Sequence, residues 1–428
     1  MTILVLNCGS SSIKYQVIKM SCANEYSLLV KGQIERIGLS DGLLVHKPVD
    51  KPKFELTKSI PDHTSGINLI LEALVDPDHG VLNSITELSA VGHRVAHGGE
   101  YFKDSAVVNK TVKQQIEACF ELAPLHNPAN LKGILSMENI LPNTPQVAVF
   151  DTSFHQTIPA KNFMYALPYK YYEEYRVRRY GFHGTSHKYV AQVGCKMTGI
   201  DFDHSKIITC HIGNGASITA ILDGKSYDTS MGFTPVDGLI MGTRCGSTDP
   251  GALIYIAEKE GLNLDRLSGM INKESGLYGI TGVSSDMRDI HAAANRGDER
   301  AKLALAMFVA RIKKFIGQYA ALMGGADLIV FTGGVGENDY LVREWVCEGM
   351  EYMGILFDKE ANDGVRARDI HPRLESQGGS RYDQRRVGDC VGYVPFAKKT
   401  FGIIRRKAGI KSAESSPALA GELFYSYF

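Results

Sequence analysis

Residues 3–18, ILVLNCGSSSIKYQVI, and residues 207–222, IITCHIGNGASITAIL, share one plan: an apolar strand, a loop of Gly, Ser and Asn, and a second strand. Apolar strands on both sides of a short polar loop are typical of a β-hairpin. Two interpretations of the similarity remain open at this point. The hairpins mark two homologous halves that face a common cleft, or they are unrelated hairpins with polar turns.

The composition is typical of a globular protein with more than one domain. The chain has 428 residues, 44% hydrophobic and 22% charged, and this length suggests two domains. Lys+Arg and Asp+Glu both number 47, so no net charge favours nucleic acid or an anionic membrane. No apolar run reaches membrane-spanning length and no signal-peptide pattern opens the chain, so we expect a cytoplasmic protein without nucleic-acid or membrane partners. The eight cysteines form no C-x-x-C pair, which favours reduced thiols.

Apolar periodicity predicts an α/β protein. Helical spacing predicts helices over 65–75, 111–122, 129–139, 186–197, 251–260 and 299–323. Further strands are predicted within SAVGHRVAHGG, QVAVFDTSFH, KIITCHIGNGASITAILDGK and DLIVFTGGVGEN. Because some consecutive strands are close enough for hairpins, we expect mixed sheets.

Three Gly-rich loops each follow an apolar strand. In the first, Gly9 allows the backbone close to a ligand, Ser10 to Ser12 offer hydroxyls, and Lys14 supplies a point charge suited to phosphate. The spacing is not that of a Walker P-loop. The others are His211–Ser217 and Phe331–Asn338. One such loop is compatible with an ordinary turn, but three together favour nucleotide binding.

Four charged or titratable residues stand among small residues: Arg94, Asp151, His183 and Arg244. Gly and Ser around an arginine suit close approach of a ligand better than core packing. Taken singly, each has a structural explanation, namely a surface ion pair for either arginine, a structural histidine, and a helix N-cap for Asp151. Asp151 also ends an apolar strand, where α/β folds place functional groups.

These segments resemble signatures of the acetate kinase family, in order and at fitting intervals from residue 1 to about 365: LVLNCGSSSIK, GHRVAHGG, FDTSFHQT, YGFHGTSH, HIGNGAS and FTGGVGEN. The family belongs to the acetate and sugar kinase, heat-shock chaperone and actin superfamily. The resemblance implies two duplicated RNase H-like (actin-like ATPase) domains, with mixed β-sheets flanked by helices and a nucleotide cleft between them. The first domain would comprise 1–150 plus the region from about 380, and the second 151–380 with most of the ATP site. The resemblance also implies a homodimer.

The resemblance further implies reversible transfer of a phosphoryl group from ATP to acetate, giving acetyl phosphate and ADP, with Mg²⁺ or Mn²⁺ as cofactor. It assigns catalysis to Asp151, His183 and Arg244, and metal binding to Asn7. The positions that match substrate-binding residues are Arg94, Ala96, Leu125, His126, Phe182 and Pro235. The positions that match ATP-binding residues are Ser12, Lys14, His211, Ile212, Gly213, Asn214, Gly215, Asp286, Met287, Arg288, Gly334, Val335, Gly336, Glu337 and Asn338.

Elementary chemistry agrees with these roles. In-line phosphoryl transfer leaves negative charge on the equatorial oxygens, which Arg94, Arg244, His183 and Mg²⁺ would stabilise. Carboxylic acids titrate near about 4, so acetate needs no general base at neutral pH. We therefore expect Asp151 to orient a magnesium-bound water or the nucleophile. The family commonly has Val where this chain has Ala96, and because a buried methylene is worth about 0.8 kcal/mol, propionate is an alternative substrate.

The segment ESQGGSRYDQRRVGDCVGY, residues 375–393, departs from the family pattern. The family ends with an apolar strand, a Thr-Asn-Glu-Glu motif that contributes a glutamate to the magnesium site, and a closing helix. Here Arg385 and Arg386 stand about where the two glutamates belong, and a basic pair repels a metal. A nucleotide-binding protein without catalysis is therefore an alternative function. A diverged basic tail and a nucleic-acid-binding extension are further interpretations of the segment.

One more interpretation comes from the genetic code. With suitable synonymous codons, the nucleotides that encode 375–393, read one base later, spell KVKVVAVTTNEELVIASDT. That is an alternating strand, Thr-Asn-Glu-Glu and a helix start. We hypothesise that the reading frame slips by one base near 366–374, and we assign the C-terminal metal glutamate to no residue of the chain as written.

Overall fold

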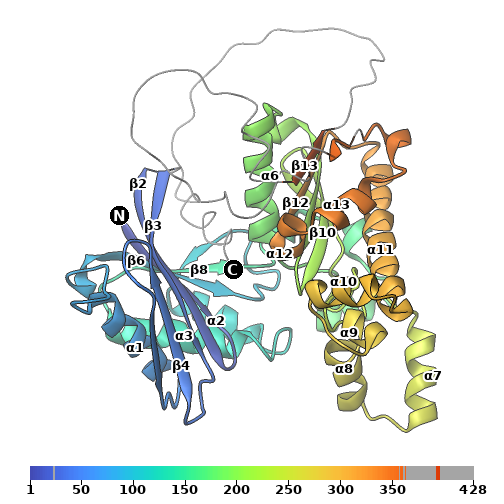
Figure 1. Ribbon diagram of the computed structural model, residues 1–428. Helices are drawn as coiled ribbons and strands as arrows, with labels where there is room; N and C mark the ends of the chain where they lie inside the picture. The colour runs from blue at the N-terminus through green and yellow to red at the C-terminus, as the bar shows by residue number, and fades with distance from the viewer. Residues whose placement is uncertain (23–24, 356, 360–361, 363–391, 396–428) are drawn as a thin grey trace. The chain divides into compact units, whose positions relative to one another are not determined.

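The computed structural model describes residues 1–22, 25–355, 357–359, 362 and 392–395 (Figure 1). These residues form two compact units that divide between Gln156 and Thr157. Each unit is built on one mixed β-sheet flanked by helices, so the predicted α/β class with mixed sheets is confirmed. Within the described ranges no helix is both long and apolar enough to cross a membrane. The domain prediction for the region from about 380 falls outside these ranges, apart from residues 392–395.

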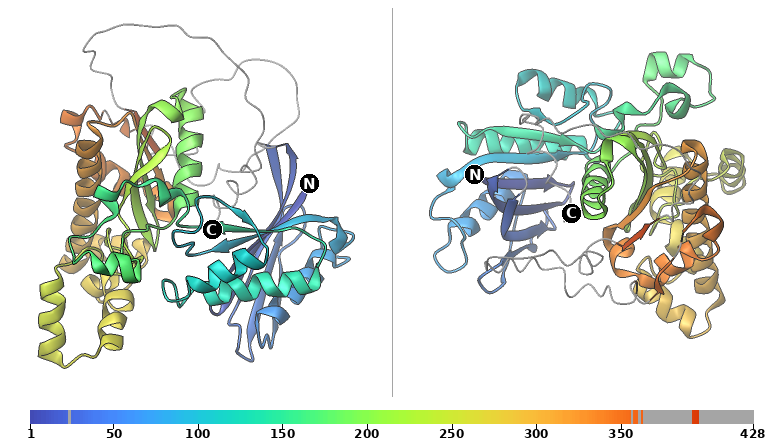
Figure 2. Two further views of the ribbon diagram at one scale, coloured as in Figure 1. Left: turned by 180° about the vertical axis from the view of Figure 1, so that it is seen from behind. Right: turned by 90° about the horizontal axis from the view of Figure 1, so that it is seen from above.

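The first unit contains an eight-stranded sheet in the order β5-β4-β3-β2-β1-β6-β8-β7. Its strands are β1 (Thr2–Cys8), β2 (Ser12–Cys22), β3 (Glu25–Glu35), β4 (Gly42–Pro48), β5 (Phe54–Lys58), β6 (Leu88–Val95), β7 (Ala106–Val107) and β8 (Gln146–Phe150). Its helices are α1 (His63–Val75), η1 (Ile85–Glu87), α2 (Lys110–Ala118) and α3 (Asn127–Ile140). The helices α1 and α3 contact β1, β2 and β6 and bury their apolar faces against this part of the sheet (Figure 2).

The second unit contains a five-stranded sheet in the order β11-β10-β9-β12-β13. Its strands are β9 (Lys206–Ile212), β10 (Ala216–Leu222), β11 (Lys225–Thr229), β12 (Leu328–Thr332) and β13 (Gly392–Pro395). Its helices are η2 (Phe154–Thr157), which spans the division, then α4 (Ala160–Phe163), α5 (Lys170–Tyr175), α6 (Gly184–Thr198), η3 (Phe202–His204), α7 (Pro250–Glu260), α8 (Leu264–Lys273), α9 (Gly276–Thr281), α10 (Met287–Asn295), α11 (Glu299–Met323), α12 (Gly333–Asn338), α13 (Tyr340–Cys347) and η4 (Glu351–Met353).

The helices α6 and α11 cover opposite faces of the second sheet. Side chains alternate between the two faces of a strand. In β12, Val330 and Leu328 approach Gly194 of α6, whereas Ile329 and Phe331 belong to the apolar core that contains the buried face of α11. A strand that is buried on both faces usually has a continuous apolar sequence, and the residues Leu328 to Phe331 of β12 form such a sequence.

The two quoted stretches form equivalent hairpins. β1 pairs antiparallel with β2 and parallel with β6, and β9 pairs antiparallel with β10 and parallel with β12. The strand orders β3-β2-β1-β6 and β11-β10-β9-β12 therefore correspond, which favours a duplicated unit over two unrelated hairpins. The next strands differ in direction, since β8 is parallel to β6 and β13 is antiparallel to β12.

The six helices predicted from apolar spacing are all present, as are the predicted strands. The prediction of a third Gly-rich loop at Phe331–Asn338 is wrong, because Gly333 already begins the short helix α12. Glu337 stabilises this start: its Oε1 accepts the Thr332 hydroxyl at 2.7 Å and the Gly333 N–H at 3.1 Å. Gly333 has φ +79°, and a Cβ there would lie 2.7 Å from the Ile212 carbonyl oxygen. The glycine thus permits a tight strand-to-helix turn against β9.

Candidate functional site

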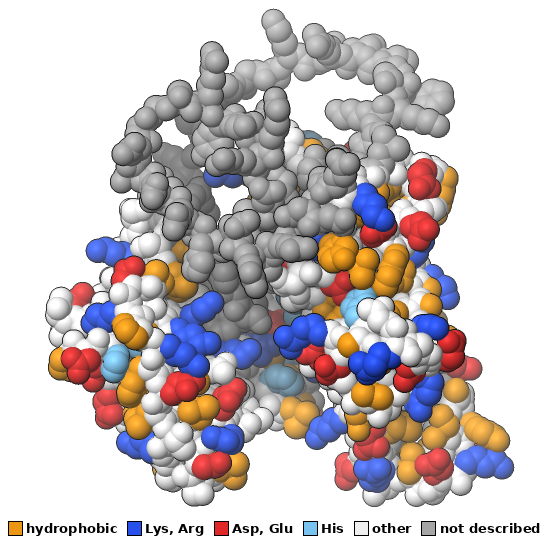
Figure 3. Space-filling view, in the orientation of Figure 1, with side chains coloured by type: hydrophobic (Ala, Val, Ile, Leu, Met, Phe, Trp, Pro, Cys, Tyr) orange, Lys and Arg blue, Asp and Glu red, His pale blue; other side chains and the backbone are white. Residues whose placement is uncertain are grey.

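Positive and negative side chains are interspersed over the face of each unit that Figure 3 shows. This distribution agrees with the equal numbers of basic and acidic residues. On this face, an anionic ligand would therefore have to be bound by local groups rather than by an extended basic field.

The second unit contains a pocket of about 870 Å³, a volume within the range of ligand pockets. The turn between β9 and β10, the start of α10, and the helices α12 and α13 contribute to its wall. Eight of the residues predicted to bind ATP line it: Gly213, Asn214, Asp286, Met287, Arg288, Gly334, Val335 and Asn338. The structure thus brings together residues that lie more than a hundred positions apart in the sequence.

The start of α10 is held by Asp286. Its carboxylate accepts the backbone N–H of Arg288 at 2.9 Å and forms an ion pair with the Arg288 guanidinium at 2.6 Å. These hydrogen bonds lower the pKa of Asp286 to about 2. The carboxylate is consequently ionised throughout the physiological pH range, and the first turn of α10 is fixed at the pocket.

The other residues that were predicted to bind ATP do not line this pocket. Ile212 is buried in β9, and Glu337 and Gly336 accept hydrogen bonds from the buried Arg343 through their carbonyl oxygens. His211 accepts from or donates to Ser186 at 2.9 Å. Ser12 and Lys14 belong to the first unit, in β2.

Several residues that line the pocket were not predicted from the sequence: Gly242, Leu277, Ser285, His291, Phe308, Asp339, Tyr340 and Leu341. The His291 Nε2 atom lies 2.8 Å from Asp339 Oδ2, although 48 positions separate the residues. One signal could have identified His291, because it follows Met287 by four residues and so lies on the same face of α10. Nothing in the spacing of Asp339 identifies it.

His183 and Arg244 converge over Gly215, which follows the pocket-lining Asn214. A Cβ at Gly215 would lie 3.5 Å from Arg244 Nη1 and 3.8 Å from His183 Nε2. Both side chains are partly exposed. The absence of a side chain at Gly215 leaves space for a group that both nitrogens can contact, as N–H donors do to an oxyanion.

His183 has an unusual backbone conformation. It is the residue before α6 and has φ 58° and ψ 20°, in the left-handed region that non-glycine residues seldom occupy. Its ring stacks on His211 with a centroid separation of 4.3 Å, and its Nδ1 lies 2.9 Å from Ser217 Oγ. Such strained backbone is concentrated at functional sites.

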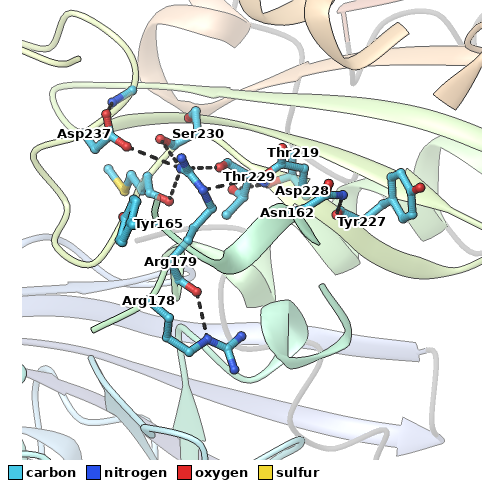
Figure 4. A network of polar contacts seen from close by, with 12 residues as sticks. Asn162, Tyr165, Arg178, Arg179, Thr219, Tyr227, Asp228, Thr229, Ser230 and Asp237 are labelled. Atoms are coloured by element: carbon cyan, nitrogen blue, oxygen red, sulfur yellow. Dashed lines mark hydrogen bonds and ion pairs between the residues drawn. The ribbon is translucent and has the colours of Figure 1, made fainter. Parts of the chain in front are cut away.

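A polar network around Arg179 fixes the segment that leads to His183 (Figure 4). Arg179 Nη1 donates to the carbonyl oxygens of Thr229 at 2.8 Å, Ser230 at 3.0 Å and Met231 at 3.0 Å. The same guanidinium lies 3.4 Å from Asp237 and 3.7 Å from Asp228. The sequence interpretation missed Arg179, and the double arginine in RRYGFH is the signal that could have found it.

The loop that carries Arg244 rests on the start of α9. Gly276 has φ +63°, and a Cβ there would lie 2.2 Å from the Met241 carbonyl oxygen and 2.7 Å from that of Arg244. Leu277 N–H donates to the Met241 carbonyl at 2.9 Å. Gly242 N–H donates to the Asn214 carbonyl at 3.0 Å, which ties this loop to the β9–β10 turn.

In the first unit, Arg94 and Asp151 form an ion pair in which the aspartate is buried and the arginine is partly exposed. Arg94 Nε donates to both carboxylate oxygens at 3.2 and 3.3 Å, and Nη2 donates to Oδ2 at 2.6 Å. Asp151 is 1% exposed. The pair lies where the parallel strands β6 and β8 end, so Asp151 is not a helix N-cap and Arg94 is not in a surface ion pair. Both of those structural explanations were wrong, because the end of the sheet brings the two residues together.

The remaining predicted residues divide between the units. Asn7 is the register partner of Lys14 in the first hairpin. In the first unit, Ala96 is buried with its N–H donated to Asn130, Leu125 is 71% exposed, and His126 precedes α3. In the second unit, Phe182 belongs to the apolar core and Pro235 is partly exposed.

No three His, Cys, Asp or Glu side chains are grouped so that they could hold a metal ion, within the part of the chain that the structure describes. Arg385 and Arg386, and the prediction made for them, lie outside that part.

The family model of the Acetokinase family matches residues 2–382. An acetate kinase from Phocaeicola vulgatus is 56% identical over 362 residues, which cover 85% of this chain and 90% of that protein. A crystal structure of Porphyromonas gingivalis acetate kinase aligns with a TM-score of 0.83 at 51% identity, covering 85% of this chain and 91% of that one. A propionate kinase from Francisella tularensis aligns with a TM-score of 0.78 at 41% identity, with the same coverage of 85% and 91%.

Proposed function

The chain belongs to the acetokinase family, and we propose that it catalyses reversible phosphoryl transfer from ATP to acetate, giving ADP and acetyl phosphate. The observation that carries this proposal is the convergence of His183 and Arg244 over Gly215, next to the pocket-lining Asn214. A phosphoryl group that is transferred needs N–H donors beside the nucleotide site, and these residues supply them.

In the proposed reaction, a carboxylate oxygen of acetate attacks the γ-phosphorus, and the bond from phosphorus to the oxygen of ADP breaks. ADP leaves with the electron pair of that bond. Acetate is ionised at neutral pH because its carboxyl group titrates near about 4, so no side chain has to remove a proton. Catalysis then consists of positioning and of charge stabilisation.

Arg94 is the proposed ligand of the acetate carboxylate. Planar guanidinium groups recognise carboxylates through paired N–H donors. Asp151 engages Nε and Nη2 of a group with five N–H donors, and so fixes its plane. This contact supports the expectation that Asp151 orients the nucleophile, here by holding the arginine that binds it.

We further propose that Mg²⁺ or Mn²⁺ takes part in the reaction, with Asn7 as a ligand. Asn7 offers an amide oxygen, a ligand type that Mg²⁺ accepts, on a partly exposed position opposite Lys14. A site with few protein ligands fits a metal that is held mainly by nucleotide phosphates. The ion would neutralise charge on the phosphate oxygens.

The experiment that tests the function incubates the purified full-length chain with ATP, Mg²⁺ and acetate, and traps acetyl phosphate with hydroxylamine. Formation of acetyl hydroxamate that depends on all three supports the proposal. ATP binding in calorimetry without hydroxamate would favour the alternative, a nucleotide-binding protein without catalysis.

Propionate is the second candidate substrate. The buried Ala96 is smaller than the valine common in the family, and a structurally similar protein is named a propionate kinase. A panel of acetate, propionate and butyrate, compared by kcat/KM, distinguishes the candidates.

A homodimer and a cytoplasmic location remain predictions from the resemblance and the sequence. Sedimentation equilibrium of the full chain tests the first, and fractionation of the source cells tests the second.

A further inference from the structure

A chain of hydrogen bonds leads from His183 into the core of the second unit. His183 Nδ1 lies 2.9 Å from Ser217 Oγ, which lies 2.7 Å from His187 Nε2. His187 Nδ1 in turn lies 2.6 Å from Thr209 Oγ1. His187, Ser217 and Thr209 are all fully buried, on α6, β10 and β9. Neither the resemblance nor the nucleotide pocket assigns a role to these three residues.

The chemistry of the groups couples the two histidines. A hydroxyl carries a single proton, so Ser217 can donate to only one of its two imidazole neighbours. A neutral imidazole has one N–H and one acceptor nitrogen. If His187 carries its proton on Nε2, Ser217 accepts that bond and donates to His183 Nδ1. The proton of a neutral His183 is then on Nε2, the atom near Gly215 and Arg244.

Thr209 determines in which direction the hydrogen bonds of this series are donated. Among the residues that the structure describes, the Thr209 hydroxyl forms its hydrogen bond with His187 Nδ1. When Thr209 donates, the hydroxyls of Thr209 and Ser217 and the N–H of His187 each have an acceptor within this series of hydrogen bonds. In the opposite direction, His187 would donate to Thr209 and leave the buried hydroxyl proton without one. Since a buried donor without an acceptor is unfavourable, the first direction is the stable one.

We propose that Thr209, His187 and Ser217 are positioning residues that hold His183 as the neutral tautomer with its proton on Nε2. This inference rests on the proposed function, because it makes His183 an N–H donor to the phosphoryl oxygens. Protonation of His183 on Nδ1 would leave the Ser217 proton without an acceptor unless the proton of His187 moved from Nε2 to Nδ1 and the Thr209 hydroxyl turned, so this series of hydrogen bonds also disfavours an additional positive charge on the His183 ring. His211, which stacks on His183, is bonded to Ser186 and stands outside the chain.

The test compares Thr209→Val with Thr219→Val in the full-length protein. Valine keeps the shape of threonine and removes the hydroxyl. Thr219 is the register partner of Thr209 on β10 and is equally buried, but its hydroxyl bonds Thr229 at 2.8 Å instead of a histidine. Thr219→Val is therefore a matched control for the loss of a buried hydroxyl from the same sheet. Thr209→Ser restores a hydroxyl and should rescue Thr209→Val.

The primary readout is the tautomer of His183, measured by long-range ¹H–¹⁵N correlation spectra of histidine-labelled protein. We expect the Nε2–H tautomer in the unmodified protein and in Thr219→Val, and a mixture of tautomers in Thr209→Val. We also expect kcat to fall about tenfold in Thr209→Val with KM for ATP and acetate little changed, since the loss concerns the transition state.

A proton on His183 Nδ1 in the unmodified protein, or an unchanged tautomer in Thr209→Val, would overturn the proposal. A changed tautomer with unchanged kcat would overturn the positioning role. If Thr209→Val does not fold, Ser217→Ala breaks the chain at its next link and is expected to release the His183 tautomer. The spectra do not depend on turnover, so a protein that forms no acetyl phosphate refutes the proposed function and leaves the hydrogen-bond chain to be judged separately.

Discussion

The ion pair of Arg94 and Asp151 makes a specific prediction about acetate binding. Asp151→Asn removes the negative charge that fixes the guanidinium, so we expect KM for acetate to rise about tenfold or more while KM for ATP changes little. Arg94→Lys should act in the same direction, because an ammonium group cannot reproduce the paired contacts. Steady-state kinetics with each substrate varied in turn measures both effects.

Glu138→Gln is the control for the Asp151 variant. It removes a carboxylate of the same unit from an equally short ion pair, with Lys113 at 2.6 Å, and should leave both KM values unchanged. A rise in KM for ATP or loss of metal affinity, with normal acetate binding, would instead assign Asp151 to the nucleotide and metal side of the reaction.

Ala96 predicts the preference among acyl groups. Its side chain is 2% exposed and its N–H is held by Asn130. Ala96→Val adds two methyl-sized groups, each worth about 0.8 kcal/mol if the space is filled, and should lower kcat/KM for propionate several-fold relative to acetate. An unchanged ratio of the two kcat/KM values would show that Ala96 does not limit acyl length.

Some residues of the candidate sites could be singled out from the sequence, and others could not. Arg94, Asp151, His183 and Arg244 were singled out as candidates because small neighbours distinguish them in the sequence. Arg179, His291 and Asp339 were missed, because their partners lie 48 or more positions away and meet them only after folding. The two simple explanations for Arg94 and Asp151 failed for the same reason.

At the scale of elements, Gly276 at the start of α9 supports the loop of Arg244. Gly276→Ala would place a Cβ 2.2 Å from the Met241 carbonyl oxygen, in addition to a left-handed strain of about 1–2 kcal/mol. We expect the loop to shift and kcat to fall at least about tenfold, as for other losses of a transition-state donor. Gly261→Ala is the matched control, since Gly261 has φ +61° but open space around it. It should lower the thermal midpoint and keep kcat, and equal kinetic effects of both variants would contradict the role of Gly276.

The strand β11 predicts a pH dependence of stability. Burial raises the pKa of Asp228 to about 6, and this desolvation outweighs the attraction of the Arg179 guanidinium 3.7 Å away. An unfolded aspartate titrates near about 4, so the folded state binds the proton more tightly and this contribution to stability is lost as pH rises from about 4 to about 6.

The Asp228→Asn variant has no carboxyl group at this position, so it should not show this loss of stability as pH rises. Relative to the unmodified protein, the variant is expected to gain stability between about pH 4 and about pH 7, by at most about 3 kcal/mol at about 1.4 kcal/mol per pKa unit. Urea unfolding at the two pH values measures the difference. The same pH dependence in both proteins would contradict the raised pKa.

Elements with strong periodicity were predictable, and short or Gly-rich ones were not. The long helix α11 was predicted with its observed bounds, whereas α2 ends at Ala118, before the predicted residue 122. The helix α12 was mistaken for a loop because its glycines have low helical propensity; tertiary packing against β9 and the Glu337 cap stabilise it instead.

At the scale of the whole molecule, the duplicated strand order bears on the C-terminal segment. The first unit has the parallel strand β8 beside β6, whereas the second has the antiparallel β13 beside the equivalent β12. The alternative reading of residues 375–393 begins KVKVVAV, an alternating pattern typical of a strand, and continues with Thr-Asn-Glu-Glu. The family resemblance requires such a strand and a metal carboxylate in the region from about 380, which it assigns to the first domain, whereas β13, at residues 392–395, lies in the sheet of the second unit.

A frame shift therefore predicts both a sequence and an activity. An independent read of the coding DNA across codons 360–395 should show one base gained or lost, with Thr-Asn-Glu-Glu restored in frame. Protein from the restored gene should bind Mg·ATP more tightly and form acetyl phosphate faster than the chain as written, because glutamates then take the place of Arg385 and Arg386. The control is a restored gene in which both glutamates of the motif are changed to glutamine. Its product should show neither the tighter Mg·ATP binding nor the faster formation of acetyl phosphate. If the DNA confirms the present frame and the restored protein is no more active, the basic segment belongs to the natural protein, and any metal carboxylate must come from elsewhere in the chain.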